Sequence, residues 1–343
     1  MMDLAARGVT LYSTCLSSIG YGLQAHLRKL VEMAGWVQDA GYRGALLYSD
    51  GASMDAWLSA QAAIASTTTF VPLVAVQPID KSPFAVARAV SSLAHLYGRP
   101  VDINFVSGGF SRDLTVQGDV LAHDARYDRL IEYATIVRML LEGGLANYAG
   151  QHYSVRRARL TEPVPADLRP RAYVSGSSAA SLRAGEALGL GQLSFPLLPG
   201  DFASPAVPRN KFGSGISVGI IAREDSAQAW RIAHKRFPAD PKGAERMKLL
   251  LSASISSWQS QLAAVPIPDQ CPGEAYWLVP FRYLHTFCPY LVGSYDEVAA
   301  AVATYLSGGV GTFVLDLPAE PDDLHHARIA IERAVAARDG AAA

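Results

Sequence analysis

Eight short apolar runs, separated by stretches in which helices are predicted, constrain the fold of this chain more than any other feature. Most residues within these runs are apolar, which is typical of strands buried on both faces of a parallel sheet. Parallel neighbours need a crossover connection between them, and a helix usually supplies it. The expected strands are 8–15, 44–48, 70–76, 101–106, 172–175, 192–197, 216–222 and 312–317.

Eight such alternations in one chain without a linker predict a (β/α)8 TIM-like barrel that forms a single domain over 1–343. The main alternative is a doubly wound sheet, which is weakened because no G-x-G-x-x-G motif follows the first strand. Residues 143–171 and 237–293 interrupt the rhythm and are expected to be excursions or a lid. Residues 199–215 hold three prolines and three glycines, so we expect no helix there and a barrel that lacks the regular helix after the sixth strand.

Composition excludes several classes of partner and site. The formal net charge is −1 and there is no basic run, which argues against nucleic-acid binding. No stretch is long and apolar enough to span a membrane, and Asp3 and Arg7 interrupt any secretory signal, so a cytoplasmic protein is expected. The three cysteines, Cys15, Cys271 and Cys288, have neither a disulfide nor a zinc spacing, and no metal site is expected.

Polar residues collect where the fourth strand ends. The strand breaks into Ser107-Gly108-Gly109, and a polar loop then leads into a helix that begins near Tyr127. In α/β folds such strand ends bind ligands. Asn104, inside the apolar strand, must find a partner, which is either a ligand atom or a neighbouring backbone group. His123 and Tyr127 are four residues apart and could both reach a phosphate, or they could be a loop histidine and a tyrosine that caps the core.

The second cluster is Ser175-Gly176-Ser177-Ser178, which joins the fifth strand to the next helix. Backbone N–H groups at a helix N-terminus, together with hydroxyls, suit an anion such as a phosphate. The alternative is an ordinary helix cap built from small residues. Ser53, after the second strand, is placed to cap the following helix, and no nucleophile motif of a hydrolase surrounds it.

These segments together resemble the luciferase-like flavin monooxygenases, and within them the two-component alkanesulfonate monooxygenases. The likeness is carried by NFVSGG at 104–109, QGDVLAHDARYDRLIEYATIVR at 117–138, YAGQHYSV at 148–155 and VSGSSAAS at 174–181. It extends to GYRGALLYSDGASMDAW, VAVQPIDKSPFAVAR, VGIIAREDSAQAW and SYDEVAAAVATYLSGGVGTFVLDLP, in the order of the family and over most of the chain.

The resemblance implies a TIM-like barrel that binds reduced FMN supplied by a separate NAD(P)H:flavin reductase. Flavin and O2 would form a C4a-(hydro)peroxyflavin, which transfers one oxygen atom to an organic substrate. At matching positions, Asn104 and Ser107 would face the isoalloxazine and ribityl groups. The residues that would hold the phosphate are His123, Tyr127, Ser177 and Ser178. Family likeness also suggests a homodimer or homotetramer.

The chain departs from the sulfonate enzymes at the residues that would bind the substrate. Where those enzymes carry Cys, Arg, Arg-x-His and Tyr, this sequence has Ser53, Gln77, Ser217 with Gly219, and Leu317. A buried sulfonate without cationic partners would cost several kcal/mol. We therefore expect a less charged substrate in a rather apolar pocket, such as a biosynthetic intermediate.

Catalytic residues are less clearly indicated than those for the flavin. His285, in the aromatic segment 276–290 that could form a lid, is a candidate to replace the histidine of the family, and Ser53 is a second candidate. Two other functions stay open. One is a deazaflavin-dependent oxidoreductase on the same barrel, and the other is a flavin-binding homologue that has lost catalysis.

Overall fold

A computed structural model describes residues 1–17, 20–49, 54–108, 111–204, 209–253, 257–265 and 274–341. Eight parallel strands close into a barrel, because each pairs with the next in the order given below and the last pairs with the first. They are β1 (Thr10–Thr14), β2 (Gly44–Leu47), β3 (Leu73–Val76), β4 (Asp102–Phe105), β7 (Ala172–Ser175), β8 (Gly191–Ser194), β9 (Ser214–Arg223) and β12 (Val310–Leu315). The predicted (β/α)8 barrel is confirmed, and each of the eight expected strands is present.

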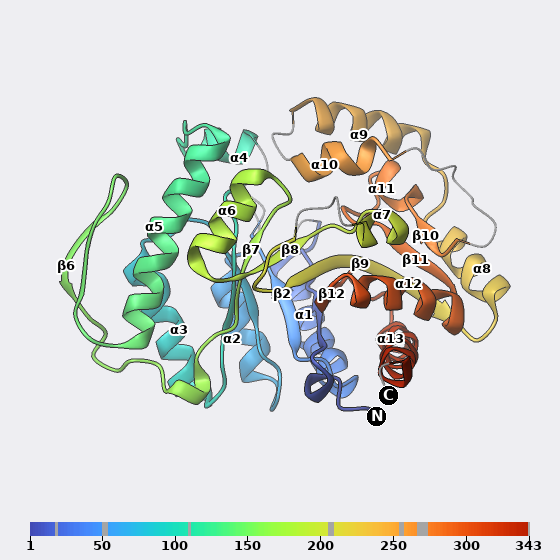
Figure 1. The fold of residues 1–343 in the computed structure, drawn as a ribbon, viewed down its shortest axis with the longest axis horizontal. Coiled ribbons are helices and arrows are strands. Elements are labelled where there is room, and N and C mark those ends of the chain that lie inside the picture. The colour runs from blue at the N-terminus through green and yellow to red at the C-terminus, as the bar shows by residue number, and fades with distance from the viewer. Residues whose placement is uncertain are drawn as a thin grey trace.

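Helices surround the barrel on its outside (Figure 1). The longer ones that follow barrel strands are α1 (Leu23–Asp39), α2 (Ala56–Ala65), α3 (Pro83–Tyr97), α5 (His123–Glu142), α6 (Ala179–Leu188), α8 (Ser226–Arg236) and α13 (Pro321–Ala341). Another long helix, α12 (Tyr295–Ser307), precedes β12. The expectation that Ser53 caps α2 is wrong, because the Asp55 carboxylate accepts hydrogen bonds from the N–H groups of Trp57 and Leu58 at 2.8 and 3.2 Å. Ser53 itself lies outside the described residues.

Two short helices differ from expectation. Helix α7 (Pro199–Ala203) lies between β8 and β9, so the expectation of no helix there is wrong. Pro199 takes the first helical position, where a missing N–H is tolerated. Helix α7 has only five residues, and no long crossover helix appears in the described part of this connection. Helix α4 (Ser111–Val116) forms within the polar segment after β4, which was expected to be a loop.

The two excursions carry structure of their own. Residues 143–171 contain the antiparallel hairpin of β5 (Ala146–Ala149) and β6 (Ser154–Ala158), and the short turn η2 (Ala166–Leu168). Residues 237–293 contain α9 (Pro241–Ala253), α10 (Ser257–Ala263), β10 (Tyr276–Trp277), α11 (Val279–Arg282) and most of β11 (Tyr290–Ser294). Strand β11, which was not expected, runs parallel to the second half of β9. Helices α9 and α10 lie at the end of the barrel opposite the two termini (Figure 1).

The barrel interior is filled by side chains rather than open. Its core comprises Tyr12, Leu73, Tyr173, Leu193 and Val314. A much larger cluster fills the space between strands and helices. None of the described helices combines the length and the apolar run that crossing a bilayer requires.

A buried ionic network closes the N-terminal end of the barrel. Asp102, the first residue of β4, has a side chain without solvent exposure. Its carboxylate accepts hydrogen bonds from the Tyr12 hydroxyl at 2.5 Å, Arg43 Nε at 2.6 Å and the Arg171 N–H at 2.7 Å. Because this network lies at the barrel end away from the strand carboxyl ends, it supports the fold rather than a ligand site.

Candidate functional site

The ends of β4 and β7 bring three of the predicted residues together. Asn104 and Tyr173 are paired in register, so Ser175 lies just beyond Asn104 on the neighbouring strand. The Ser175 hydroxyl donates to Asn104 Oδ1 at 2.8 Å, and the Tyr127 hydroxyl donates to the Ser175 carbonyl at 3.0 Å. Asn104 therefore has a side-chain partner on β7, which neither of the two alternatives predicted.

Tyr127 is the centre of this group. Its hydroxyl also interacts with the hydroxyls of Ser107, Ser178 and Ser181, which lower the pKa of the phenol, but burial raises that pKa by more. The phenol therefore stays protonated and can donate a hydrogen bond at neutral pH. Helix α5 places Tyr127 one turn after His123, and the two rings are 5.2 Å apart, as the shared helix face predicted.

Gly176 is required by the turn between β7 and α6. Its φ of +128° is one that L side chains rarely adopt. A Cβ at this position would lie 2.5 Å from Tyr127 Oη and 2.8 Å from Ser181 Cβ. The turn therefore has no room for a side chain, and the backbone of residue 176 lies directly against Tyr127 and Ser181 in front of the α6 N-terminus.

The two serines after Gly176 have different partners. Ser178 caps α6, because its hydroxyl accepts a hydrogen bond from the Ser181 N–H at 3.2 Å. This is the ordinary helix cap that the sequence offered as the alternative to phosphate binding. Ser177 instead donates to Gln261 Oε1 at 2.8 Å, so α10 reaches over this turn. His123 Nδ1 lies 2.7 Å from Asp124 Oδ1 and this contact lowers the pKa of Asp124.

Arg126 belongs to this candidate site, although the sequence motifs did not indicate it. It is 3 % exposed; its Nε donates to the Ser107 carbonyl at 3.1 Å and its Nη1 donates to the Leu121 carbonyl at 2.9 Å. Its Nη2 is buried and has no hydrogen-bond partner among the described residues. The sequence did contain a signal for Arg126, because helical spacing places it on the same face of α5 as Leu130 and Tyr133. A cation on such a buried face needs a partner.

His285 lies elsewhere. It is exposed, its Nε2 is 2.8 Å from the Pro238 carbonyl oxygen, and its ring packs 5.7 Å from that of Phe237. Its described contacts do not include the residues at the ends of β4 and β7. Ser53, the other catalytic candidate, lies outside the described residues, so both catalytic assignments stay predictions.

The Tyr290 ring occupies the space in front of Gly219, the residue that matches the histidine of the sulfonate enzymes. A Cβ on Gly219 would lie 2.2 Å from the Tyr290 ring, so the ring rests directly on the glycine backbone. The Tyr290 hydroxyl donates to Asp316 Oδ2 at 2.7 Å, beyond the end of β12, and burial raises the pKa of the Asp316 carboxyl. This aromatic contact depends on β11, which the sequence did not predict.

These features define a (β/α)8-barrel protein with a candidate ligand site at the carboxyl ends of its strands. Residues 8–312 match the family model of the luciferase-like monooxygenases. The chain therefore belongs to the luciferase-like monooxygenase family, as the sequence motifs predicted.

Known proteins that resemble this chain match it over nearly its whole length. The 4-(gamma-L-glutamylamino)butanoyl-[BtrI acyl-carrier protein] monooxygenase BtrO of Niallia circulans is 30% identical over 319 residues, which are 90% of this chain and 92% of that protein. The structure of riboflavin lyase RcaE with modified FMN and riboflavin superposes with a TM-score of 0.70 at 17% identity, covering 95% of this chain and 91% of that one. The EDTA monooxygenase EmoA of Chelativorans sp. BNC1 gives a TM-score of 0.68 at 16% identity, covering 97% and 94%. The two structural likenesses concern the fold.

Proposed function

We propose that this protein is an FMNH2-dependent two-component monooxygenase that inserts one oxygen atom of O2 into an organic, non-sulfonate substrate. A separate NAD(P)H:flavin reductase supplies the reduced flavin. The observation that carries the proposal is the turn at Gly176 in a chain of this family. Its left-handed φ brings bare backbone to the α6 N-terminus beside the Tyr127 hydroxyl.

The residues around this turn are the ones we assign to a flavin phosphate. The Ser178 hydroxyl and the N–H groups at the start of α6 can donate to it, and His123 lies beside them next to Tyr127. The Ser177 and Tyr127 hydroxyls can donate to it once they release Gln261 and the Ser175 carbonyl. The unpartnered Nη2 of Arg126 supplies a buried cationic donor beside the Ser107 carbonyl, which favours an anion nearby. Asn104 and Ser107 are assigned to the isoalloxazine and ribityl end. Reduced FMN, when bound, supplies the electrons that activate O2.

We assign a lid function to residues 237–293 within one domain that spans 1–343, and we regard 143–171 as a surface excursion. Helices α9 and α10 lie at the barrel end that carries the site, and Gln261 of α10 holds the Ser177 hydroxyl (Figure 1). For Ser177 to bind a phosphate oxygen, it must exchange Gln261 for that oxygen. Flavin binding and lid position are therefore coupled.

The proposed substrate is a neutral biosynthetic intermediate rather than a sulfonate. Ser217, Gly219 and Leu317 offer no cation, and the Tyr290 ring covers Gly219. The name of BtrO describes a carrier-bound amide-containing acyl chain, and by that likeness we propose a substrate of related kind. The two described cysteines are buried and reduced, in keeping with a cytoplasmic enzyme. We expect a homodimer or homotetramer.

The decisive experiment for the function is rapid mixing. The protein is loaded with FMNH2 without oxygen and then mixed with O2, and absorbance is followed for a long-lived flavin species distinct from reduced and oxidised FMN. We expect such a species, followed by oxygenated product with carrier-bound or free acyl amides. If none accumulates and no product forms, the oxygenase function is rejected. Equal affinity for oxidised and reduced FMN would favour a flavin-binding protein without catalysis, and reactivity with a reduced deazaflavin alone would favour the deazaflavin enzyme.

A double substitution tests the phosphate assignment. Ser177→Ala with Ser178→Ala should weaken FMN binding about a hundredfold, because each hydrogen bond to a charged group contributes about 1.5 kcal/mol. Loss of the Ser178 cap should also lower stability by about 1 kcal/mol. Ser66→Ala with Ser307→Ala removes two exposed hydroxyls and is the matched control. Unchanged FMN affinity by fluorescence titration would remove both serines from the site.

A further inference from the structure

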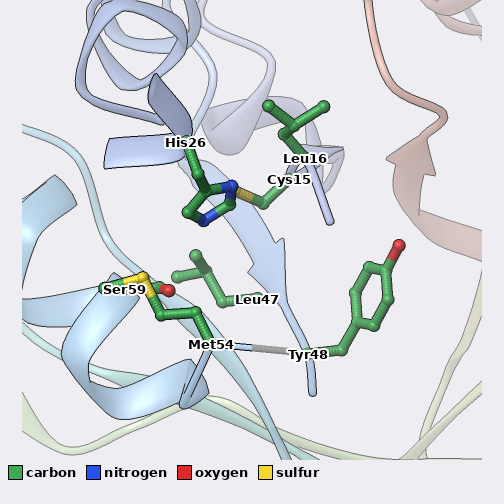
Figure 2. Close-up of a pocket in the computed structure, with 7 residues that line it drawn as sticks. All are labelled: Cys15, Leu16, His26, Leu47, Tyr48, Met54 and Ser59. Atoms are coloured by element: carbon green, nitrogen blue, oxygen red, sulfur yellow. The ribbon is translucent and has the colours of Figure 1, made fainter. Parts of the chain in front are cut away.

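A cavity lies beside the carboxyl ends of β1 and β2, at the same barrel end as the candidate flavin residues (Figure 2). The enclosed space has room for about one water-sized group, about 10 Å³, and the whole depression, including the part open to solvent, is about 250 Å³. Helix α1 contributes His26 and helix α2 contributes Ser59 to its wall. Leu47 is the last residue of β2. The other lining residues are Cys15 and Leu16 after β1, Tyr48 after β2, and Met54 before α2. Only β3 separates β2 from β4 in the barrel.

His26 carries the unexplained polar atom of this cavity. The residue is 2 % exposed, and its Nδ1 is buried without a hydrogen-bond partner among the described residues. Burial lowers the pKa of the imidazole, and a hydrogen bond with the Ser17 backbone opposes this with a smaller effect. The ring is therefore neutral at pH 7, and a neutral ring nitrogen buried without a partner is unfavourable unless a ligand or water supplies one.

The other described lining residues add no charge. Leu16, Leu47 and Met54 are apolar, and Ser59 is a buried neutral donor and acceptor. Burial raises the pKa of the Cys15 thiol to about 12, so it stays protonated. A carboxylate or sulfonate placed here would lose its hydration without gaining a cation, whereas an amide or hydroxyl needs only a hydrogen bond.

We propose that this cavity is the polar end of the substrate pocket, and that His26 Nδ1 hydrogen-bonds an uncharged amide or hydroxyl group of the substrate. The inference rests on the proposed function and deepens it by naming the chemistry recognised at one end of the substrate. His26 binds and orients the substrate here and takes no part in oxygen transfer.

Binding of small probes tests the site without reductant or oxygen. FMN-loaded protein labelled with ¹⁵N-histidine is titrated with hexanamide, hexanoate and hexylammonium, three chains of equal length with a neutral, an anionic and a cationic head. We expect hexanamide to move the Nδ1 resonance of His26 and to bind at least fivefold more tightly than either ion. Preference for hexanoate, or binding of hexanamide that leaves the His26 resonance unchanged, overturns the proposal.

Substitutions separate the hydrogen bond from packing. His26→Leu should weaken hexanamide binding about tenfold, because it removes one hydrogen bond, and a hydrogen bond of ordinary net strength changes the Kd by about that factor. His26→Asn, whose amide places a hydrogen-bonding atom near the position of Nδ1, should recover most of the affinity. His325→Leu replaces an exposed histidine of α13 and should change nothing. If the His26→Leu protein binds hexanamide as tightly as the wild type does, the proposal fails. FMN affinity is measured in the same samples, so this outcome is distinguished from a failure of the flavin site.

Discussion

Replacing Gly176 with alanine should weaken FMN binding more than a hundredfold and lower the free energy of unfolding by about 3 kcal/mol. The methyl group would meet Tyr127 Oη at 2.5 Å and Ser181 Cβ at 2.8 Å, and the backbone would keep a φ of +128° that alanine tolerates poorly. Because Ser181 is fixed by the α6 helix and Tyr127 by its bond to Ser175, neither neighbour can move aside cheaply. The affinity is measured by FMN fluorescence and the stability by urea unfolding.

The control for this substitution is Gly98→Ala. Gly98 also has a positive φ, +62°, but a Cβ there would meet nothing within 4 Å. It ends α3, away from the candidate site. Backbone strain alone should cost about 1 kcal/mol without changing FMN affinity. Wild-type FMN affinity in Gly176→Ala would show that the flavin phosphate does not bind at this turn.

Replacing Asp102 with asparagine should destabilise the protein by about 3 kcal/mol while leaving FMN affinity within twofold of wild type. The substitution keeps the shape but leaves the Arg43 guanidinium, bound at 2.6 and 3.1 Å, without its carboxylate. The Tyr12 hydroxyl also loses its charged acceptor. Because Asp102 lies at the N-terminal end of β4, the effect belongs to the barrel rather than to the ligand site.

An exposed ion pair provides the comparison. Asp296→Asn removes the 2.7 Å contact with Arg333, where both side chains are largely in water, and should change stability by less than about 0.5 kcal/mol. Urea unfolding gives both stabilities and FMN titration of the folded protein gives the affinities. A large loss of FMN affinity in Asp102→Asn at unchanged stability would contradict the division between the two ends of the barrel.

The sequence was a good guide to local structure and to the cofactor side of the site. Apolar runs and crossover spacing predicted all eight barrel strands, because a strand buried on both faces must be apolar throughout. Spacing also placed His123 beside Tyr127, and strand ends placed Asn104 and Ser175 together, because parallel strands end at one edge. Helices α4 and α7 were missed because five or six residues with proline or polar side chains carry little helical pattern.

Contacts between distant segments had no local signature. Strand β11 brings Tyr290 over Gly219 and onto Asp316, and no spacing within the sequence relates these three residues. Gln261 on Ser177 is a contact across 84 residues, and the orphaned Nδ1 of His26 is visible only when α1 is packed against the ends of β1 and β2. Arg126 could have been found, since a cation on an apolar helix face needs a partner.

By itself the sequence determined the barrel, the family and the segments that meet at the ends of β4 and β7, because periodicity and glycine placement are local properties of the chain. Only the tertiary structure decided that Gly176 has no room for a side chain, that Tyr290 covers Gly219, and that His26 faces a cavity without a partner. The physical reason is that excluded volume and unsatisfied hydrogen bonds depend on which distant atoms surround a residue, and packing alone brings those atoms together.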